Sequence, residues 1–306
     1  MRDRVLALLA PALTHAGSVL VDATVGLGGH ADLALRSFPS LQLVGIDRDP
    51  SALAVARERL AQWSGRVQLV HAVYDDIPGV LQGIGIDHAD GILFDLGVSS
   101  MQLDDPARGF SYSTPSALDM RMNPSDTLTA AMIVNEYPEQ ELVRVLRDFG
   151  EERFARRIAR GILRARESRP LTESRELVDI VREAIPAPAR RTGGNPAKRT
   201  FQALRIEVNA ELSILRRAIP AALDVLSVGG RMVVLSYQSL EDRIVKREFV
   251  DRASSSVPLD MPFIPEGREP SYRVLTRGAE QATAQEIAEN PRAASVRLRA
   301  IERVAA

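Results

Sequence analysis

The segment SVLVDATVGLGGHADLAL, residues 18–35, decides the fold. Residues 18–23 form a short apolar run rich in valine, which predicts a buried strand. Gly26, Gly28 and Gly29 follow directly. Glycines allow the tight turn and the close backbone approach to a ligand that such a loop provides at the start of a helix. We therefore expect the first strand–loop–helix unit of a nucleotide-binding α/β sheet.

Strand and helix patterns alternate through the first hundred residues. Apolar runs predict three further strands, at 41–47, 67–77 and 91–96. Residues 49–63 predict a helix between the first two of these, with Asp49 as N-cap and Pro50 at the first helical position. Strands that alternate with helices form right-handed βαβ units in a parallel sheet.

The pattern changes after residue 105. It predicts a loop at 105–125, helices through 127–184, a Pro/Gly-rich basic loop at 186–200 and one long helix at 200–223. Strand patterns return at 229–237 and 295–304. We therefore predict an α/β domain made of residues 1–105 and 201–306, interrupted by an all-helical insert at 106–200.

Composition excludes several classes of protein. The 306 residues contain no Cys, and the four His show no HxxH or HExxH spacing, so we expect no disulfide and no metal site. No apolar run approaches the length of a membrane span, and residues 1–14 predict a first helix rather than a signal peptide. We expect a cytoplasmic protein without a membrane partner.

Charge is unevenly distributed in a chain whose net charge is −1. Residues 1–100 hold eleven acidic and seven basic side chains, a balance of −4, whereas residues 151–205 hold seven acidic and fourteen basic ones, a balance of +7. A basic block of this kind indicates a surface for a polyanion, with a solvated helix face as the alternative.

Acidic residues follow the predicted strands. Asp47 ends the second strand, where a carboxylate can accept both ribose hydroxyls of an adenosine, and Asp75 and Asp76 follow the third. The spacing Gly26-x-Gly28-x-x-Ala31 fits a dinucleotide fingerprint, and methyltransferases that use S-adenosylmethionine share the same half-sheet. The sequence therefore predicts a nucleoside site, but the spacing does not choose between these two cofactors.

Asp95 ends the fourth predicted strand, and Gly97, Ser99 and Ser100 follow it. Ligands of an open α/β sheet bind beyond the carboxyl ends of its strands, so Asp95 is expected at the reactive end of the cofactor. The alternative is an Asp that caps the next helix. We favour the site, because the continuation SMQLDDPARGFSY is irregular for a helix start.

Seven segments together resemble the bacterial 16S ribosomal RNA cytosine-N4 methyltransferases of the MraW or RsmH type. The longest is DLGVSSMQLDDPARGFSYSTPSALDMRMN, residues 95–123. The others are VDATVGLGGHA, GIDRDP, GEERFARRIARGI, KRTFQALRIEVNAEL, GGRMVVLSYQSLEDRIVKREF and NPRAASVRLRAIER. They run in one order from residue 18 towards the C-terminus, and the IPAPARR and SYQSLEDR variants resemble the actinobacterial branch.

The resemblance implies a Rossmann-like class I methyltransferase domain that uses S-adenosyl-L-methionine, with a helical insert that helps to bind RNA. It implies methyl transfer to the exocyclic N4 of a cytosine in the decoding region of 16S rRNA, within the small ribosomal subunit. The oligomeric state stays open, with a homodimer as one alternative. The family's cofactor contacts fall on Gly28, Gly29, His30, Asp47, Tyr74, Asp95 and Gln102.

Two features depart from the family pattern. Family members usually begin with a His-x-Pro-Val segment before the first helix, and the sequence leaves open whether Met1 is the true start. Gln238 stands in SYQSLEDR where His is usual. We interpret this residue as evidence that the reaction needs no His base there.

Asp95 is the predicted catalytic residue, which would accept a hydrogen bond from the N4 amine and orient it. DNA amino-methyltransferases carry a Pro-Pro-aromatic sequence after this acid, which is missing here, so the target base must stack elsewhere. Phe110, Tyr112 and Tyr237 are candidates, each of which could equally be a core residue.

Basic side chains of the insert are the predicted RNA contacts. Arg190, Arg191, Lys198 and Arg199 lie in the Gly/Pro loop and fit phosphate contacts. Four arginines at helical spacing add to them, namely Arg153, Arg156, Arg157 and Arg160. Some of these helix arginines could pair with Glu151 and Glu152 instead.

Two other functions compete with this interpretation. A nicotinamide-dependent oxidoreductase is allowed by the glycine pattern, but it explains neither the basic insert nor the Asp95 segment. An RNA-binding protein without turnover is the second alternative, and retained RNA binding without cofactor binding would identify it.

Overall fold

The computed structural model describes residues 1–190, 195–254 and 269–305, and the chain folds into two compact units. The first unit comprises Met1–Gly97 and Leu212–Ala306, and the second comprises Val98–Glu211. The predicted insert, 106–200, falls inside the second unit, which extends beyond it at both ends.

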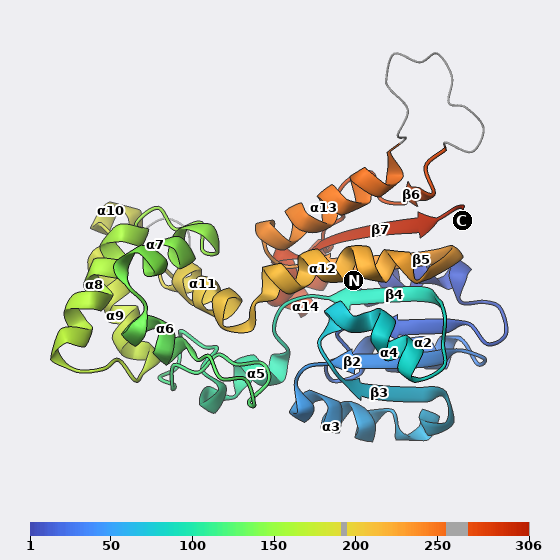
Figure 1. Ribbon diagram of the computed structural model, residues 1–306, viewed down its shortest axis with the longest axis horizontal. Coiled ribbons are helices and arrows are strands. Elements are labelled where there is room, and N and C mark those ends of the chain that lie inside the picture. The colour runs from blue at the N-terminus through green and yellow to red at the C-terminus, as the bar shows by residue number, and fades with distance from the viewer. Residues whose placement is uncertain (191–194, 255–268, 306) are drawn as a thin grey trace, which may run out of the picture. The chain divides into compact units, whose positions relative to one another are not determined.

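A seven-stranded sheet forms the centre of the first unit, within the described residues, and its strand order is β3-β2-β1-β4-β5-β7-β6 (Figure 1). The strands are β1 (Val19–Asp22), β2 (Gln42–Asp47), β3 (Val67–His71), β4 (Ala89–Asp95), β5 (Leu226–Ser236), β6 (Tyr272–Val274) and β7 (Arg297–Arg303). The strands from β3 to β5 in this order are parallel, whereas β7 runs antiparallel to β5 and β6 antiparallel to β7. The order reverses between β1 and β4, which is where open α/β sheets bind their ligands.

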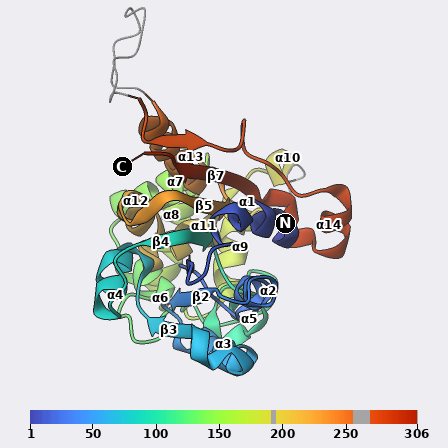
Figure 2. The same ribbon diagram turned by 90° about the vertical axis from the view of Figure 1, so that its right-hand side faces the viewer.

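Helices cover both faces of this sheet, as Figure 2 shows. One face packs on α1 (Arg2–Leu9), α2 (Gly29–Ser37) and α3 (Pro50–Arg59), and the other on α4 (Ile77–Gly83), α12 (Glu211–Asp224) and α13 (Ser239–Ala253). A short α14 (Ala284–Glu289) lies between β6 and β7 in the chain. Neighbouring residues alternate between the faces: Leu20 packs with the first set of helices and Val21 with the second.

The predicted α/β architecture is confirmed, with changes at particular elements. The third strand ends at His71, not at residue 77, because the chain turns into a 3₁₀ helix at Tyr74–Asp76. Strand β6 and helix α14 carried no clear pattern and were not predicted. No helix among the described residues has both the length and the apolar character needed to cross a bilayer.

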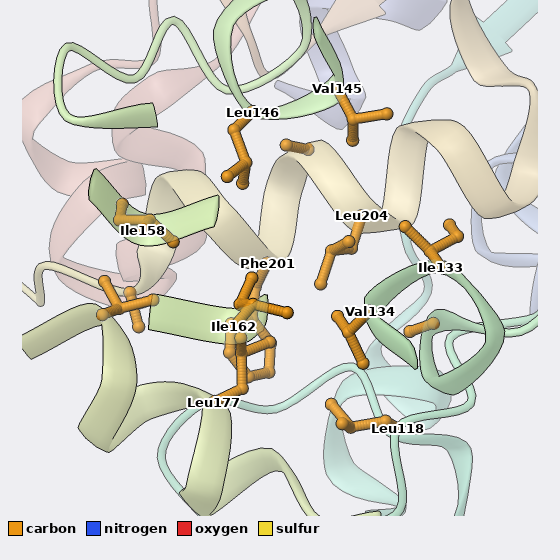
Figure 3. Close-up of a cluster of buried hydrophobic side chains, with 14 of the residues drawn as sticks. Leu118, Ile133, Val134, Val145, Leu146, Ile158, Ile162, Leu177, Phe201 and Leu204 are labelled. Atoms are coloured by element: carbon orange, nitrogen blue, oxygen red, sulfur yellow. The ribbon is translucent and has the colours of Figure 1, made fainter. Parts of the chain in front are cut away.

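The second unit is helical around one apolar core, in which Phe201 and Leu204 of α11 meet Ile158, Ile162 and Leu177 of neighbouring helices (Figure 3). Its helices are α5 (Ser100–Asp104), α6 (Ala130–Glu136), α7 (Glu139–Asp148), α8 (Ala155–Ser168), α9 (Ser174–Ala184), α10 (Ala187–Arg190) and α11 (Lys198–Asn209). The buried apolar residues of α8 and α9 recur at intervals of three and four residues, so each helix has one apolar stripe that packs into this core.

The single helix predicted at 200–223 is wrong. Helix α11 ends at Asn209, and Ala210 takes a left-handed conformation with φ of +51° before α12 begins. Asn209 is buried: its amide nitrogen donates to the carbonyl of Met120, and its amide oxygen accepts from the N–H of Met122. These tertiary hydrogen bonds hold the end of α11 against a loop far away in sequence, which local helix propensity cannot reveal.

Candidate active site at the carboxyl ends of the strands

Three aspartates gather at one edge of the sheet because their strands are parallel. Asp22 ends β1, and in the strand register it lies level with Gly45 of β2 and Leu93 of β4. Asp47 and Asp95 therefore extend two residues beyond Asp22 at the same edge. This edge is the ligand-binding side predicted from the sequence.

The glycine loop between β1 and α2 needs glycine at two positions. Gly26 and Gly28 have φ of +49° and +77°, a region that other residues rarely adopt. Gly28 is also the N-cap of α2, and a Cβ there would lie 3.4 Å from Leu60. At Gly26 a Cβ would meet only the Thr24 carbonyl, at 3.8 Å, so the backbone of this loop is open to a close ligand.

Asp47 is held by the backbone of two loops. Its Oδ2 accepts from the N–H of Gly26 and its Oδ1 from the N–H of Asp49, both at 2.8 Å. Burial raises the pKa of Asp47, and these two hydrogen bonds oppose the rise. Because a carboxylate has about four lone-pair sites, each oxygen can still accept from a ligand hydroxyl.

Asp95 is contacted by side chains from two other elements. The hydroxyl of Tyr237 donates to Oδ1 at 2.9 Å, and Nε2 of His30 lies 3.5 Å from Oδ2. The backbone N–H of Asp95 donates to the hydroxyl of Thr24 at 2.6 Å. The side chain is 31% exposed, so the carboxylate is held in place and still reachable.

The charges at this edge depend on one another. Burial raises the pKa of Asp22 to about 7, with smaller increases from the negative charges of Asp95 and Asp47 and a decrease from His30. Burial lowers the pKa of His30, but Asp95 and Asp22 outweigh it, so the pKa is raised above its ordinary value. The three carboxylates and the imidazole thus form one electrostatic unit, which favours a cationic ligand.

Tyr74 lies half-buried just after β3, with its ring edge-on to Phe94 at 5.5 Å between centroids. Asp75, the next residue, does not present a free carboxylate, since its Oδ2 accepts from two nitrogens of Arg217. Asp76, the other acid that follows β3, is exposed.

Gln102 is part of a helix cap in the second unit. Its N–H donates to the Ser99 hydroxyl, and its side-chain oxygen accepts from the Ser99 N–H. A helix therefore does begin after Asp95, contrary to the expectation from the irregular sequence, but Ser99 is its N-cap. The capping pattern Ser-x-x-Gln was the signal that sequence reasoning missed.

Much of the segment at 105–123 has a structural role. Arg108 donates to the carbonyls of Arg121 and Met122, and a Cβ at Gly109 would lie 2.3 Å from the carbonyl oxygen of Ala117. Phe110 is 6% exposed in the core of the second unit, which favours the core alternative over stacking on a base. Tyr112 packs its ring against Phe201 in the same core.

Gln238 is the N-cap of α13, and its side-chain nitrogen donates to Glu241 at 3.0 Å. A residue that caps a helix need not exchange protons, so Gln can stand there.

The predicted RNA contacts are exposed where the structure describes them. Arg190, Lys198 and Arg199 are exposed, and Arg199 also donates to the Glu151 carbonyl. Arg191 lies outside the described residues. Arg153, just before α8, and Arg156, Arg157 and Arg160 on this helix are exposed too. Arg160 pairs with Glu139 rather than with the acids suggested from the sequence.

Comparison with known proteins decides between the two nucleoside interpretations of the glycine loop. The model of the MraW methylase family matches residues 1–304. This chain belongs to the MraW methylase family. It is therefore a methyltransferase, and its methyl donor is S-adenosyl-L-methionine.

Three members of this family are similar to almost the whole chain, and each is named ribosomal RNA small subunit methyltransferase H. The Frankia alni protein is 64% identical over 306 residues, which is 100% of this chain and 94% of the relative. The Nocardioides protein is 60% identical over 98% of this chain and 94% of the relative. The Mycolicibacterium smegmatis protein is 59% identical over 99% of this chain and 82% of the relative.

The residues at the strand ends fit this cofactor. The Asp47 carboxylate suits a ribose diol, and the open backbone at Gly26 lets a ligand approach closely. Asp22 and Asp95 place negative charge at an edge where the cofactor would bring a positive sulfonium. An adenine could lie against the half-buried Tyr74.

Cofactor binding is expected to weaken as the pH falls through 7. Asp22 gains a proton there, since its pKa is about 7. The pKa of His30 is raised by Asp95 and Asp22, so a falling pH also adds positive charge at this residue. The affinity for a cation should therefore fall about fivefold to tenfold between pH 8 and pH 6, the change expected from one acid titrating near neutrality. Isothermal titration calorimetry would measure it.

The same titration on an Asp22→Asn variant is the control, and its affinity should vary less with pH. S-adenosylhomocysteine, which lacks the sulfonium charge, should also respond weakly. An affinity of the wild-type protein that is equal at both pH values would contradict this assignment.

Proposed function

We propose that this protein transfers the methyl group of S-adenosyl-L-methionine to the exocyclic N4 of a cytosine in the decoding region of 16S rRNA, within the small ribosomal subunit in the cytoplasm. The names of the relatives support ribosomal RNA of the small subunit as the substrate. The observation that supports an amine acceptor is the held, partly exposed carboxylate of Asp95 at the switch point of the sheet.

The cofactor contacts in this proposal follow the geometry of the strand ends. Gly28, Gly29 and His30 would line the side of the methionine moiety, Asp47 would accept the ribose hydroxyls, and Tyr74 would lie beside the adenine. Asp95 would lie at the sulfonium end. The contact at Gln102 stays a prediction, since its side-chain oxygen already accepts from the Ser99 N–H.

S-adenosyl-L-methionine supplies a methyl group that is already activated on a positive sulfur. The N4 lone pair would form the new bond to the methyl carbon while the carbon–sulfur bond breaks with its electrons going to sulfur, and N4 would then lose one proton to solvent water. Asp95 would accept a hydrogen bond from an N4 hydrogen, which draws the lone pair out of conjugation with the ring. Holding the amine in line with the departing sulfur is the main task, and such positioning supplies roughly 7–11 kcal/mol.

The second unit would bind RNA through its exposed basic side chains. Phosphate contacts position a nucleic acid without reading its sequence, and Arg190, Arg191, Lys198 and Arg199 suit that role. The target cytosine would leave its stack to reach Asp95, as bases do in enzymes that act on them.

Reversing one charge on this unit should weaken RNA binding alone. Lys198→Glu should lower the affinity for small-subunit RNA severalfold and reduce the slope of log affinity against log salt by about 1, as expected for one lost phosphate contact. The affinity for S-adenosyl-L-methionine should not change. Lys198 begins α11, where a Glu suits the helix dipole, so the fold is not endangered.

Arg57→Glu is the matched control, since Arg57 is exposed on α3 of the first unit. It makes the same charge change and should leave RNA affinity unaltered. Equal RNA affinity in wild-type and Lys198→Glu proteins would mean that this patch is a solvated face.

Methyl transfer itself tests the proposed function. The purified protein would be incubated with S-adenosyl-L-methionine and small subunits that lack the modification, and the nucleosides of the digested RNA identified by mass. N4-methylcytidine is the expected product, and mapping it would locate the cytosine. A methylated nucleoside of another kind, or none, would contradict the proposal.

A further inference from the structure

Side chains from two elements other than β4 contact the carboxylate of Asp95. Tyr237 reaches Oδ1 from beyond β5, and His30 faces Oδ2 from the first turn of α2. Tyr237 and Asp95 are 142 residues apart in sequence, so this contact exists only in the folded protein.

Tyr237 is placed by the register of the sheet. Asp95 pairs with Leu235 on the parallel strand β5, so Tyr237 follows two residues beyond at the same edge. Its backbone N–H donates to Oε2 of Glu241 at 2.9 Å, and Glu241 is 3% exposed in the first turn of α13. The hydroxyl thus extends from a fixed backbone rather than from a mobile loop.

The hydroxyl of Tyr237 acts as a donor at every physiological pH. Burial raises its pKa far above the ordinary value of a tyrosine, and the negative charge of Asp95 raises it further. The phenol therefore keeps its proton and is excluded as a general base. A hydrogen bond from such a donor to a carboxylate is charge-assisted and correspondingly strong.

We propose that Tyr237 is a positioning residue, whose hydroxyl sets the rotation of the Asp95 carboxylate so that its free lone pairs face the acceptor amine. This inference rests on the proposed function of Asp95. A carboxylate rotates readily about its last side-chain bond, where the preference is broad. Fixing it in one orientation favours reaction, because small misplacements of a catalytic group cost large factors in rate.

Tyr237 also borders a cavity of about 160 Å³, together with Gln238, Ser239 and Arg297, among other residues. Tyr237 therefore both contacts Asp95 and borders this cavity.

Tyr237→Phe removes the hydroxyl and keeps the ring, which makes it the direct test. The rate of methyl transfer in a single turnover on small subunits should fall about tenfold, which corresponds to about 1.4 kcal/mol. The dissociation constant of S-adenosyl-L-methionine should stay within twofold of wild type. If Tyr237 had a purely structural role, the variant would lose methyl-transfer rate and cofactor affinity together.

Tyr272→Phe is the matched control. Tyr272 lies in the same unit, and its hydroxyl donates to the carbonyl of Leu223 at 2.8 Å, outside the strand-end site. This variant loses a buried hydroxyl hydrogen bond and should transfer methyl groups at the wild-type rate.

A double variant shows whether Tyr237 acts through Asp95. Adding Tyr237→Phe to Asp95→Asn should slow transfer much less than tenfold, because the group it positions is already altered. Wild-type rate in Tyr237→Phe, or a full tenfold loss in both backgrounds, would overturn the proposal. Failure of the proposed function would be seen separately, as a wild-type protein that forms no N4-methylcytidine.

Discussion

Asp95→Ala protein should transfer methyl groups roughly 100-fold to 1000-fold more slowly than wild type, the loss typical when a group that stabilises the transition state is removed. Without the carboxylate, the N4 amine would lose the hydrogen-bond acceptor that the proposal places at the end of β4. The amine would keep its lone pair in the ring and approach the methyl group in less favourable orientations. Single-turnover transfer to small subunits would measure this rate.

Cofactor affinity should change by less than about tenfold in the same variant, because one hydrogen-bonding group among several is lost. Asp90→Ala is the control on the same strand: Asp90 accepts from the N–H of Val19 at the opposite end of the sheet. It should leave the rate unchanged. An Asp95→Ala protein that binds cofactor normally and methylates at near wild-type rate would remove Asp95 from the mechanism.

Asp47→Ala should weaken the binding of S-adenosyl-L-methionine at least about 100-fold. Hydrogen bonds to a charged group contribute roughly 1.5–3 kcal/mol each, and a ribose diol would lose two of them. The N–H groups of Gly26 and Asp49 would also lose the oxygens that fix the loop. Isothermal titration calorimetry would give the dissociation constant.

At saturating cofactor, the Asp47→Ala protein should recover most of its rate, since Asp47 contacts no reacting atom in this proposal. Asp32→Ala is the control, because Asp32 of α2 pairs with Arg36 of the same helix and with Trp63, and it is not among the residues assigned to the cofactor. A dissociation constant within threefold of wild type in Asp47→Ala would contradict the ribose assignment. The two aspartates are thus expected to differ in kind, one affecting rate and the other affinity.

Part of the candidate site could be predicted because it depends on local sequence. The apolar run at 18–23, the glycines after it and the acids at the ends of later runs are all readable, since strand ends in a parallel sheet share one edge. Asp47 and Asp95 lie where that rule places them. Their contacts with the cofactor and the base stay predictions.

Other features could not be predicted, because they depend on contacts between distant residues. Ala210 breaks a segment whose helical pattern continues on both sides, and Asn209 is held by a loop at Met120 and Met122. Phe110 stands in a motif that suggested a binding surface, yet it packs into a core. No periodicity distinguishes an aromatic residue of a core from one of a site.

The alternation of strands and helices in the first hundred residues, the acidic strand ends and the basic insert were determined by the sequence itself, because hydrophobic spacing, glycine backbone freedom and charge are local properties. Only the tertiary structure decided that Tyr237 would hold Asp95 and that the amide of Asn209 would bind the backbone at Met120 and Met122. The reason is physical: a hydroxyl, an amide or a ring has no set partner until the packing of the sheet and its helices brings one within hydrogen-bonding distance.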